Sequence, residues 1–426
     1  MKTKIFVVFF ACLSYLNLFA QISDRELPSY RNASKYFLEI LDFSSGQENI
    51  TRIDVFIQVP YSSVRFIKKD TLFIAGYKIV LSVFDENKEK LIMDKTWSEK
   101  IQLTSFDQTI SKDNASLAMR SFFLLPGKYF LRIELNDNES KAEYSKEEFI
   151  NVRNLSGEVS LSDIMLLAKR KEEEGKNKIV PYVSLNVANF KSGLPLFYEI
   201  YSKKPQKIEI EYSISNDKNK IFYTDSASKY IDSGKTQIIY TLKDSSFSLG
   251  NYNLTVELRN SNNQIIAAVR KKFYSRWVGV PSTITDLDQA INEMIYIAST
   301  SQIGYIKNAS TNEEKKNRFL EFWKQQDPVS SNSENPYFIE YYNRVAYANE
   351  HFSQYFPGWR SDRGMVFILL GPPDNIERYP FEMNSKPYEI WTYYQLNVSL
   401  VFVDQTGFGD YRLITPLTGD LNRFRL

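Results

Sequence analysis

Few side chains in this sequence could perform nucleophilic or metal chemistry. The 426 residues include one histidine, His351, and one cysteine, Cys12. A Ser-His-Asp or Cys-His site needs a histidine within reach of the nucleophile, and zinc is usually held by several Cys or His ligands. His351 shares the polar side of an expected helix with Glu340, Arg344 and Tyr347, which favours a solvated or packing histidine over a general base. We therefore expect no metal site and no nucleophile–histidine pair.

Carboxylates are the remaining candidates for acid–base chemistry. Those that adjoin turns near the C-terminus are Asp362, Asp374, Glu377, Asp404 and Asp410. A glycosidase needs two such groups about 5–10 Å apart. Each also has an ordinary structural explanation, because Asp362 can cap a turn or pair with Arg363, and Asp374 follows a Pro-Pro turn. The segment 404–410 suits a hairpin loop and lacks the regular acidic alternation of a calcium loop. No glycine-rich phosphate loop is present, so we expect no cofactor.

These carboxylates adjoin a turn-rich segment from Pro357 to Asp374. Within it, Met365 to Leu370 is a continuous apolar run of strand length. Glycines precede this run and Pro372-Pro373 follows it, so the pattern predicts a turn, a buried central strand and a second turn. The candidate motif and binding residues of the segment are Gly358, Trp359, Ser361, Asp362, Arg363, Gly371, Pro372, Pro373 and Asp374.

The N-terminus has the pattern of an export signal. Met1 to Lys4 is basic, Ile5 to Leu13 is apolar, and Leu18-Phe19-Ala20 is a cleavage site of the expected kind, so residues 1–20 are predicted to be removed. Only about 16 residues separate Lys4 from the polar run that begins at Gln21. A bilayer span needs about 20, so no transmembrane segment is expected after cleavage.

Cleavage would leave a neutral chain without cysteine. The alternative, a lipoprotein anchored at Cys12, has a poor lipobox because Leu13 to Phe19 would remain as an apolar tail. Without Cys12 no disulfide can form, although an exported protein would permit one. Removal of Lys2 and Lys4 changes 53 basic and 51 acidic residues to 51 and 51, since 53 − 2 = 51. Nucleic-acid binding requires a basic surface, so no nucleic-acid partner is expected.

The first part of the chain alternates apolar and polar residues as strands do. The stretch LPGKYFLRIEL from Leu125 to Leu135 is echoed by LGNYNLTVEL from Leu249 to Leu258, with tyrosines at 129 and 252. Such a strand resembles a late strand of immunoglobulin-like envelope domains, whose tyrosine packs inward while its hydroxyl reaches the backbone. The pattern predicts two tandem all-β immunoglobulin-like sandwiches at 28–152 and 176–276. A linker at 153–175 joins them, in which Leu161 to Leu167 is either a strand or a short helix.

The pattern then changes to a helical period. Asp286, Thr311 and Asn335 are expected to cap three helices that bury one apolar face each. We assign 280–355 to this helical lead and 356–426 to an α+β domain. Its small antiparallel sheet would comprise Met365–Leu370, Tyr388–Tyr394, Asn397–Val403 and Asp410–Ile414. The chain is thus predicted to be multidomain, with two sandwiches followed by an α+β C-terminal domain.

The segment Gly358-Trp-Arg-Ser-Asp-Arg-Gly364 resembles the bacterial GWxTD domain family, named for that pentapeptide. Similar blocks lie upstream, at Phe322–Pro328 and Tyr341–Glu350, and downstream, at Gly371–Asp374, Tyr388–Trp391 and Phe402–Gly409. About a hundred residues, from Glu313 to Thr415, are covered. Ser361 stands where the family name has threonine, and a hydroxyl is retained. The resemblance implies an exported protein of uncharacterised function with β-sandwiches ahead of the motif, and it implies no catalytic residues.

Two functions are compatible with these residues. The favoured one is a non-catalytic exported envelope protein, at the periplasm or cell surface of a Gram-negative-type bacterium, that binds an envelope protein or glycan through the motif domain. The alternative is a carbohydrate-active hydrolase that uses the turn carboxylates. Carboxylates that converge in an open cleft lined by aromatic side chains would favour the hydrolase.

Overall fold

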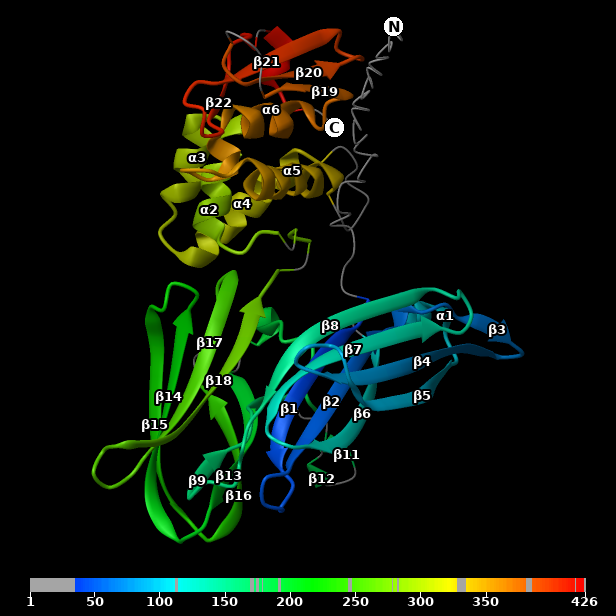
Figure 1. The fold of residues 1–426 in the computed structure, drawn as a ribbon, viewed down its shortest axis with the longest axis vertical. Helices are drawn as coiled ribbons and strands as arrows, with labels where there is room; N and C mark the ends of the chain where they lie inside the picture. Colours follow the sequence, from blue (N-terminus) through cyan, green and yellow to red (C-terminus); the bar gives the residue numbers. More distant parts are fainter. Residues whose placement is uncertain are drawn as a thin grey trace, which may run out of the picture. The chain divides into compact units, whose positions relative to one another are not determined.

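The computed structural model describes residues 35–424 except 112–113, 169–171, 174–175, 178, 191–192, 244–246, 278, 282, 328–334, 381–384 and 418. The predicted export segment, 1–20, lies outside these residues. Most of the described chain forms β-sandwich-type sheets, and a smaller part with helices follows them (Figure 1). Within the described ranges, no helix is both long enough and apolar enough to cross a membrane.

Two antiparallel sheets form the first part of the described chain. One has the order β1-β2-β6, and the other has the order β3-β4-β7-β8 with β5 paired to β4. The elements are β1 (Phe37–Ser44), β2 (Thr51–Pro60), η1 (Tyr61–Ser63), β3 (Ile67–Lys69), β4 (Leu72–Asp85), β5 (Leu91–Leu103), α1 (Phe106–Thr109), β6 (Ala115–Leu124), β7 (Gly127–Asp137) and β8 (Glu143–Val152). Alternate residues, such as Ile53 and Val55 on β2 and Leu131 and Ile133 on β7, are buried in one apolar cluster. The alternation in the sequence is therefore the inside–outside alternation of two packed sheets.

A second pair of sheets follows. In one, β13 pairs with β9, β10 and β16, and the other has the order β15-β14-β17-β18. The elements are β9 (Val159–Leu161), β10 (Met165–Leu166), η2 (Val187–Asn189), β13 (Leu194–Ser202), β14 (Gln206–Asn216), β15 (Ile221–Ile231), β16 (Gly234–Leu242), β17 (Gly250–Arg259) and β18 (Ile265–Ser275). Tyr198 and Tyr212 lie at the centre of its core, where their hydroxyl groups are 2.8 Å apart.

The predicted linker at 153–175 needs correction. Strands β9 and β10 lie inside it and pair with β13, so these residues belong to the second pair of sheets. In the charged run after them, the described strands β11 (Glu172–Glu173) and β12 (Lys176–Asn177) pair with each other. The strands β9 and β10 have only three and two residues, which is too short for alternation to distinguish them from a linker.

The two pairs of sheets repeat the same strand pairing. Strand β2 pairs with β1 and β6 as β13 pairs with β9, β10 and β16. Strand β4 pairs with β5 and β7 as β14 pairs with β15 and β17, and the pair β7–β8 corresponds to β17–β18. Tyr129 lies opposite Asp85, the last residue of β4, and Tyr252 lies opposite Asn216, the last residue of β14.

Both tyrosines also make the predicted contact with the backbone. The Tyr129 hydroxyl donates to the Leu125 carbonyl at 3.0 Å, and the Tyr252 hydroxyl donates to the Ser248 carbonyl at 2.8 Å. Each bond spans four residues and closes the corner before the strand. The prediction that the echoed strands occupy equivalent positions is confirmed.

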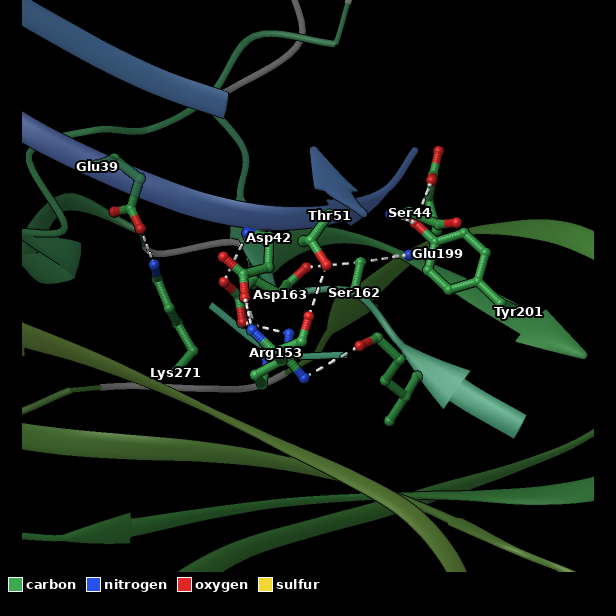
Figure 2. Close-up of polar contacts among 11 residues, drawn as sticks. Glu39, Asp42, Ser44, Thr51, Arg153, Ser162, Asp163, Glu199, Tyr201 and Lys271 are labelled. Atoms are coloured by element: carbon green, nitrogen blue, oxygen red, sulfur yellow. Dashed lines mark hydrogen bonds and ion pairs between the residues drawn. The ribbon is translucent and has the colours of Figure 1, made fainter. Parts of the chain in front are cut away.

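The outward faces of β1 and β2 pack against β10 and β13. Phe43 and Phe56 from the first sheets meet Met165 and Phe197 from the second in a separate apolar cluster. Beside this cluster lies a set of buried and half-buried polar contacts, which we call the junction (Figure 2). It comprises Glu39, Asp42, Ser44, Thr51, Arg153, Ser162, Asp163, Glu199, Tyr201 and Lys271.

Asp42 and Asp163 share Arg153 at the centre of the junction. The Arg153 backbone N–H donates to Asp42 at 2.8 Å, and its guanidinium donates to Asp163 at 2.6 Å (Figure 2). The Asp42 backbone N–H in turn donates to the Asp163 carboxylate at 2.8 Å. Burial, followed by the charge of Asp163, raises the pKa of Asp42 to about 6.

The C-terminal part combines helices with a four-stranded antiparallel sheet in the order β19-β20-β21-β22 (Figure 1). The elements are α2 (Leu287–Glu293), η3 (Met294–Tyr296), α3 (Thr300–Lys307), α4 (Asn312–Gln325), α5 (Pro336–Phe352), η4 (Gly358–Arg360), α6 (Asp362–Leu370), β19 (Asn375–Tyr379), β20 (Tyr388–Tyr393), β21 (Val398–Asp404), β22 (Tyr411–Leu413) and η5 (Gly419–Asn422). Asp286, Thr311 and Asn335 each accept a backbone N–H at the start of α2, α4 and α5, as predicted.

The prediction of a central strand at Met365 to Leu370 is wrong. These residues belong to helix α6, and the fourth strand of the sheet is β19. The Ser361 side chain accepts the Gly364 N–H at the start of the helix, and Gly371, with φ of +82°, ends it.

From Met365 to Leu370, helix α6 is apolar on all sides because it lies between two cores. Val366 and Phe367 pack in the cluster that includes the sheet residues Trp391 and Phe402. Ile368 and Leu369 pack in the other cluster, with the helices α2 to α5. A helix buried on every side shows no polar stripe, so its sequence reads like that of a buried strand.

We expect the junction to be more stable at mildly acidic pH. The pKa of Asp42 is higher in the folded chain than the ordinary value of about 3.9, so its stabilising effect is complete below about pH 4 and is lost as pH rises through about 6. From this group alone, the unfolding free energy should rise by about 1 kcal/mol between pH 7.5 and pH 5. Buried Glu39 also has a raised pKa, caused first by desolvation, and acts in the same direction.

Thermal unfolding at pH 5 and pH 7.5 measures this effect. Asp42→Asn should remove about 1 kcal/mol of the pH dependence, whereas Asp232→Asn, at an exposed aspartate, should leave it unchanged. An Asp42→Asn chain with the pH dependence of the unaltered protein would contradict the assignment.

Candidate functional site

The motif begins with a tight turn on the end of helix α5. The Gly358 N–H donates to the Ser353 hydroxyl at 2.7 Å, and that hydroxyl donates to the Asn349 carbonyl at 2.6 Å. A Cβ on Gly358 would lie 2.6 Å from the Ala348 carbonyl carbon and closer still to its oxygen. The turn can lie against α5 only because this position has no side chain.

Trp359 is buried in the core of the helices, with 5% of its surface exposed. Its backbone N–H donates to the Asn349 side-chain oxygen at 3.1 Å, and its backbone carbonyl accepts the Tyr296 hydroxyl at 2.8 Å. The ring lies edge-on to Tyr296 at 6.4 Å, and the Arg360 guanidinium lies 4.8 Å from it. Trp359 shares the apolar cluster of Trp323 and Tyr341, as expected, but the ring partner it meets is Tyr296.

Ser361 and Gly364 fix the start of α6. The buried Ser361 hydroxyl donates to the Gly358 carbonyl at 2.7 Å and accepts the Gly364 N–H at 3.0 Å. A threonine offers the same hydroxyl, so serine at this position preserves the cap. A Cβ on Gly364 would lie 2.9 Å from the Gly358 carbonyl carbon, which explains the second glycine of the segment.

Asp362 and Arg363 do not pair with each other, which corrects one of the two roles expected for Asp362. The Asp362 carboxylate accepts the Leu413 N–H of β22 at 2.8 Å and lies 3.9 Å from Arg412. Arg363 reaches buried Glu389 of β20 at 3.4 Å. The two side chains therefore attach the first turn of α6 to different strands of the sheet.

The Arg363 guanidinium is enclosed by aromatic rings. It lies 4.2 Å from the ring of Tyr411 and 5.3 Å from the ring of Phe352, and it donates to the Gly409 carbonyl. Only 12% of its side chain is exposed. Stacking, a carboxylate and a carbonyl together compensate for the burial of this charge.

Gly371 to Asp374 form the turn after α6. A Cβ on Gly371 would lie 3.2 Å from the guanidinium of buried Arg344, and the Gly371 carbonyl accepts the Tyr393 hydroxyl at 3.0 Å. Pro372 is exposed and Pro373 is half-buried. Asp374 accepts the Tyr394 N–H at 2.6 Å, so it joins the turn to the end of β20.

The candidate carboxylates each have a partner within the fold. Asp404 accepts the N–H groups of Gly407 and Gly409 at 2.9 and 2.6 Å, and these backbone bonds outweigh desolvation and lower its pKa. Asp410 pairs with Arg412 at 3.0 Å, and Glu377 accepts from Asn375 and Tyr379. Asp362 and Asp410 both lie within 4 Å of Arg412, while Asp374 bonds to Tyr394 just after the end of β20. Within the described ranges, no group of three or more His, Cys, Asp or Glu residues could hold a metal ion.

Sequence reasoning missed three polar residues that support the motif. Glu389 is buried and accepts from Arg363, Arg378 and Trp391. The sequence indicated the burial of Glu389 through its position, because it alternates along β20 with the buried residues Trp391 and Tyr393. Arg344 is also buried, where it donates to the Ile368 carbonyl, although the helical pattern placed it on the polar side of α5.

The third missed residue, Glu293, is buried and forms no ion pair with the residues that the structure describes. It accepts from Gln289 at 2.9 Å and from Asn349 at 3.4 Å, and desolvation raises its pKa. Asn349 also accepts from Trp359, so this acid is linked to the motif. His351 is exposed, stacks on Tyr347 at 3.9 Å and contacts the Tyr347 carbonyl, which matches a solvated histidine.

Comparison with known proteins identifies one family. The GWxTD domain matches residues 250–410, which begin at strand β17 and end just before β22. No curated protein matches the chain.

Several solved structures show a weak likeness. They include a β-glucuronidase 2 of Bacteroides uniformis covalently bound to cyclophellitol-6-carboxylate aziridine (8% identity, 54% of this chain and 27% of that one, TM-score 0.21). Another is red sea bream transglutaminase, with 10% identity over 58% of this chain and 32% of that one and a TM-score of 0.18. A third is a glycosyl hydrolase family 2 member from Bacteroides cellulosilyticus, with 9% identity over 56% of this chain and 31% of that one and a TM-score of 0.23. The chain spans about a third or less of each protein, and TM-scores this low support no shared activity.

The close approach at Gly364 is directly testable. Gly364→Ala should lower the unfolding free energy by about 1–3 kcal/mol, because its Cβ would collide with the Gly358 carbonyl. Gly304→Ala in helix α3 is the control, since a Cβ there meets nothing within 4 Å, and it should stabilise the chain by about 0.5–1 kcal/mol. Equal effects of the two substitutions on the thermal midpoint would contradict the packing described.

A second prediction concerns Asp362. Asp362→Ala should cost about 1–2 kcal/mol, because the N–H of half-buried Leu413 loses its acceptor. Asp362→Asn should cost less than about 1 kcal/mol, since the amide oxygen can still accept that bond and only the charge at the helix N-terminus is lost. Chemical denaturation of both variants decides this, and a larger loss for asparagine than for alanine would refute the assigned role.

Proposed function

Because this chain belongs to the GWxTD domain-containing protein family, we propose that it is a non-catalytic, exported protein of the bacterial cell envelope. In this proposal the two pairs of sheets are tandem immunoglobulin-like sandwiches that act as spacers or docking modules. The motif domain binds an envelope protein or glycan. No cofactor and no nucleic acid takes part.

One observation carries the non-catalytic assignment: the polar groups of the motif are used within the fold. Ser361 caps α6, Asp362 holds Leu413 and Arg363 holds Glu389. A general acid or base must instead present its carboxyl group to a substrate. The motif residues thus support a structural role, and binding is assigned to exposed residues beside them.

Two exposed aromatic residues lie beside the motif. Tyr355 precedes the turn and is 74% exposed, and Phe408 lies in the loop before β22 and is 73% exposed. The two loops touch, since a Cβ on Gly409 would lie 3.0 Å from the Gln354 side chain. Exposed aromatic side chains of this kind contact partner proteins and sugar rings through their faces. We assign the partner-binding surface to these two loops.

Export rests on the N-terminal sequence, which lies outside the described residues. A basic start, an apolar run from Ile5 to Leu13 and the Leu-Phe-Ala site support cleavage after Ala20. Intact-mass analysis of the envelope-located form tests this step separately from binding.

Capture from envelope fractions tests the binding surface. Tyr355→Ala and Phe408→Ala should each capture at least tenfold less partner than the unaltered protein. Their thermal midpoints should stay within about 2 °C of its value, because both side chains are exposed. Tyr394→Ala is the matched control, since Tyr394 is 66% exposed at the far end of β20, and it should retain the partner. Retention by all three variants would reject this surface.

Treatment of the fraction with protease or with glycosidases before capture distinguishes a protein partner from a glycan. The same fractions test the hydrolase alternative. The non-catalytic assignment would be overturned if the unaltered protein released new reducing ends from a glycan and both Asp362→Asn and Asp410→Asn abolished that release.

A further inference from the structure

A cavity of about 440 Å³ opens at one end of the first pair of sheets. It is lined by Ser62, Val64, Phe66, Lys68, Phe73, Phe106, Thr109 and Ile110. These residues come from η1, the segment before β3, the strands β3 and β4, and the short helix α1 with the residue after it. Figure 1 shows α1 and β3 at the same end of the sheet. The size falls within the range of about 300–1,000 Å³ that is common for small-molecule sites.

Most of the lining is apolar and much of it is exposed. Phe106 and Ile110 are each 59% exposed at the rim, and Phe66 and Phe73 are half-buried. The rings of Phe73 and Phe106 lie 5.8 Å apart, so they form one continuous wall. Single exposed apolar residues are ordinary, but a concave cluster of them marks a surface that another molecule covers.

Among the residues that the structure describes, one charged side chain lines the cavity. Lys68 lies on β3 opposite Phe73, it is exposed, and no acceptor bonds to it in the part of the chain that the structure describes. Two nearby carboxylates within the described ranges, Asp70 before β4 and Asp107 in α1, are not part of the lining. The cavity therefore combines an apolar wall with one available positive charge.

We propose that this cavity binds a single-chain anionic amphiphile, with its hydrocarbon chain against Phe66, Phe73 and Phe106 and its acid group beside Lys68. Charge complementarity favours this occupant, because an acid group can pair with Lys68 and an uncharged apolar segment cannot. The site lies in the first pair of sheets and does not depend on the function proposed for the motif domain.

Titration of the full chain with a fluorescent probe, dansyl-aminoundecanoic acid, tests the site. We expect saturable one-to-one binding that dodecanoate displaces at least tenfold more effectively than dodecanol, which has no charge. No saturable binding, or equal displacement by the two compounds, would overturn the proposal.

Variants with matched controls locate the binding. Phe106→Asp should weaken probe binding at least tenfold, whereas Phe123→Asp, at a residue that is 60% exposed on β6, should not. Lys68→Gln should remove the preference for dodecanoate over dodecanol, whereas Lys69→Gln, outside the lining, should keep it. Unchanged thermal midpoints show that each variant is folded. Probe binding that is insensitive to Phe106→Asp, or association with anionic phospholipid vesicles without binding of the monomeric acid, would also reject the site.

Discussion

The C-terminal part depends on the contact between the Gly358 carbonyl and the backbone of Gly364. That carbonyl accepts the Ser361 N–H and hydroxyl and occupies the space where a Gly364 side chain would be. The turn is itself held on α5 through Ser353 and Asn349. With both ends fixed, α6 can leave the turn in only one direction. That direction carries Asp362 to β22 and Arg363 to β20.

Local signals were enough to predict the parts of this arrangement that depend on short spacing. The capping residues Asp286, Thr311 and Asn335 were identified because a cap needs only a side chain and the next turn of helix. The apolar run at Met365 to Leu370 was misassigned because its burial depends on two clusters that come from distant segments. For Glu389 the alternation of β20 indicated a buried position, but it could not show the partner, since Arg363 lies 26 residues away. Tertiary contacts decide such positions, and they leave little trace in the local pattern.

In the sheets, too, features set by neighbouring residues were predicted from the sequence, whereas contacts between distant segments were not. Alternation and the repeated Gly-x-Tyr pattern predicted two equivalent strands, and both were found with the same partners. The junction was not predicted. It requires Asp42, Arg153 and Asp163 to meet from three segments, and each of them would otherwise be read as an ordinary surface charge. Buried Glu39 keeps one carboxylate oxygen without a hydrogen-bond partner within the described residues, which adds to the cost of holding the junction ionised at neutral pH.

The buried pair of Arg363 and Glu389 is better explained by strand register than by stability. A buried ion pair contributes little compared with apolar residues of the same size, because both charges lose their hydration. Its geometry is nevertheless selective. A shift of β20 by one residue would turn Glu389 to the solvent face and place Tyr388 or Ile390 against Arg363, which would leave a buried guanidinium without its carboxylate. Trp391, which donates to the same Glu389, would leave the core in that shift. The carboxylate of Glu389 thus links the register of the sheet to the position of Arg363 at the start of α6.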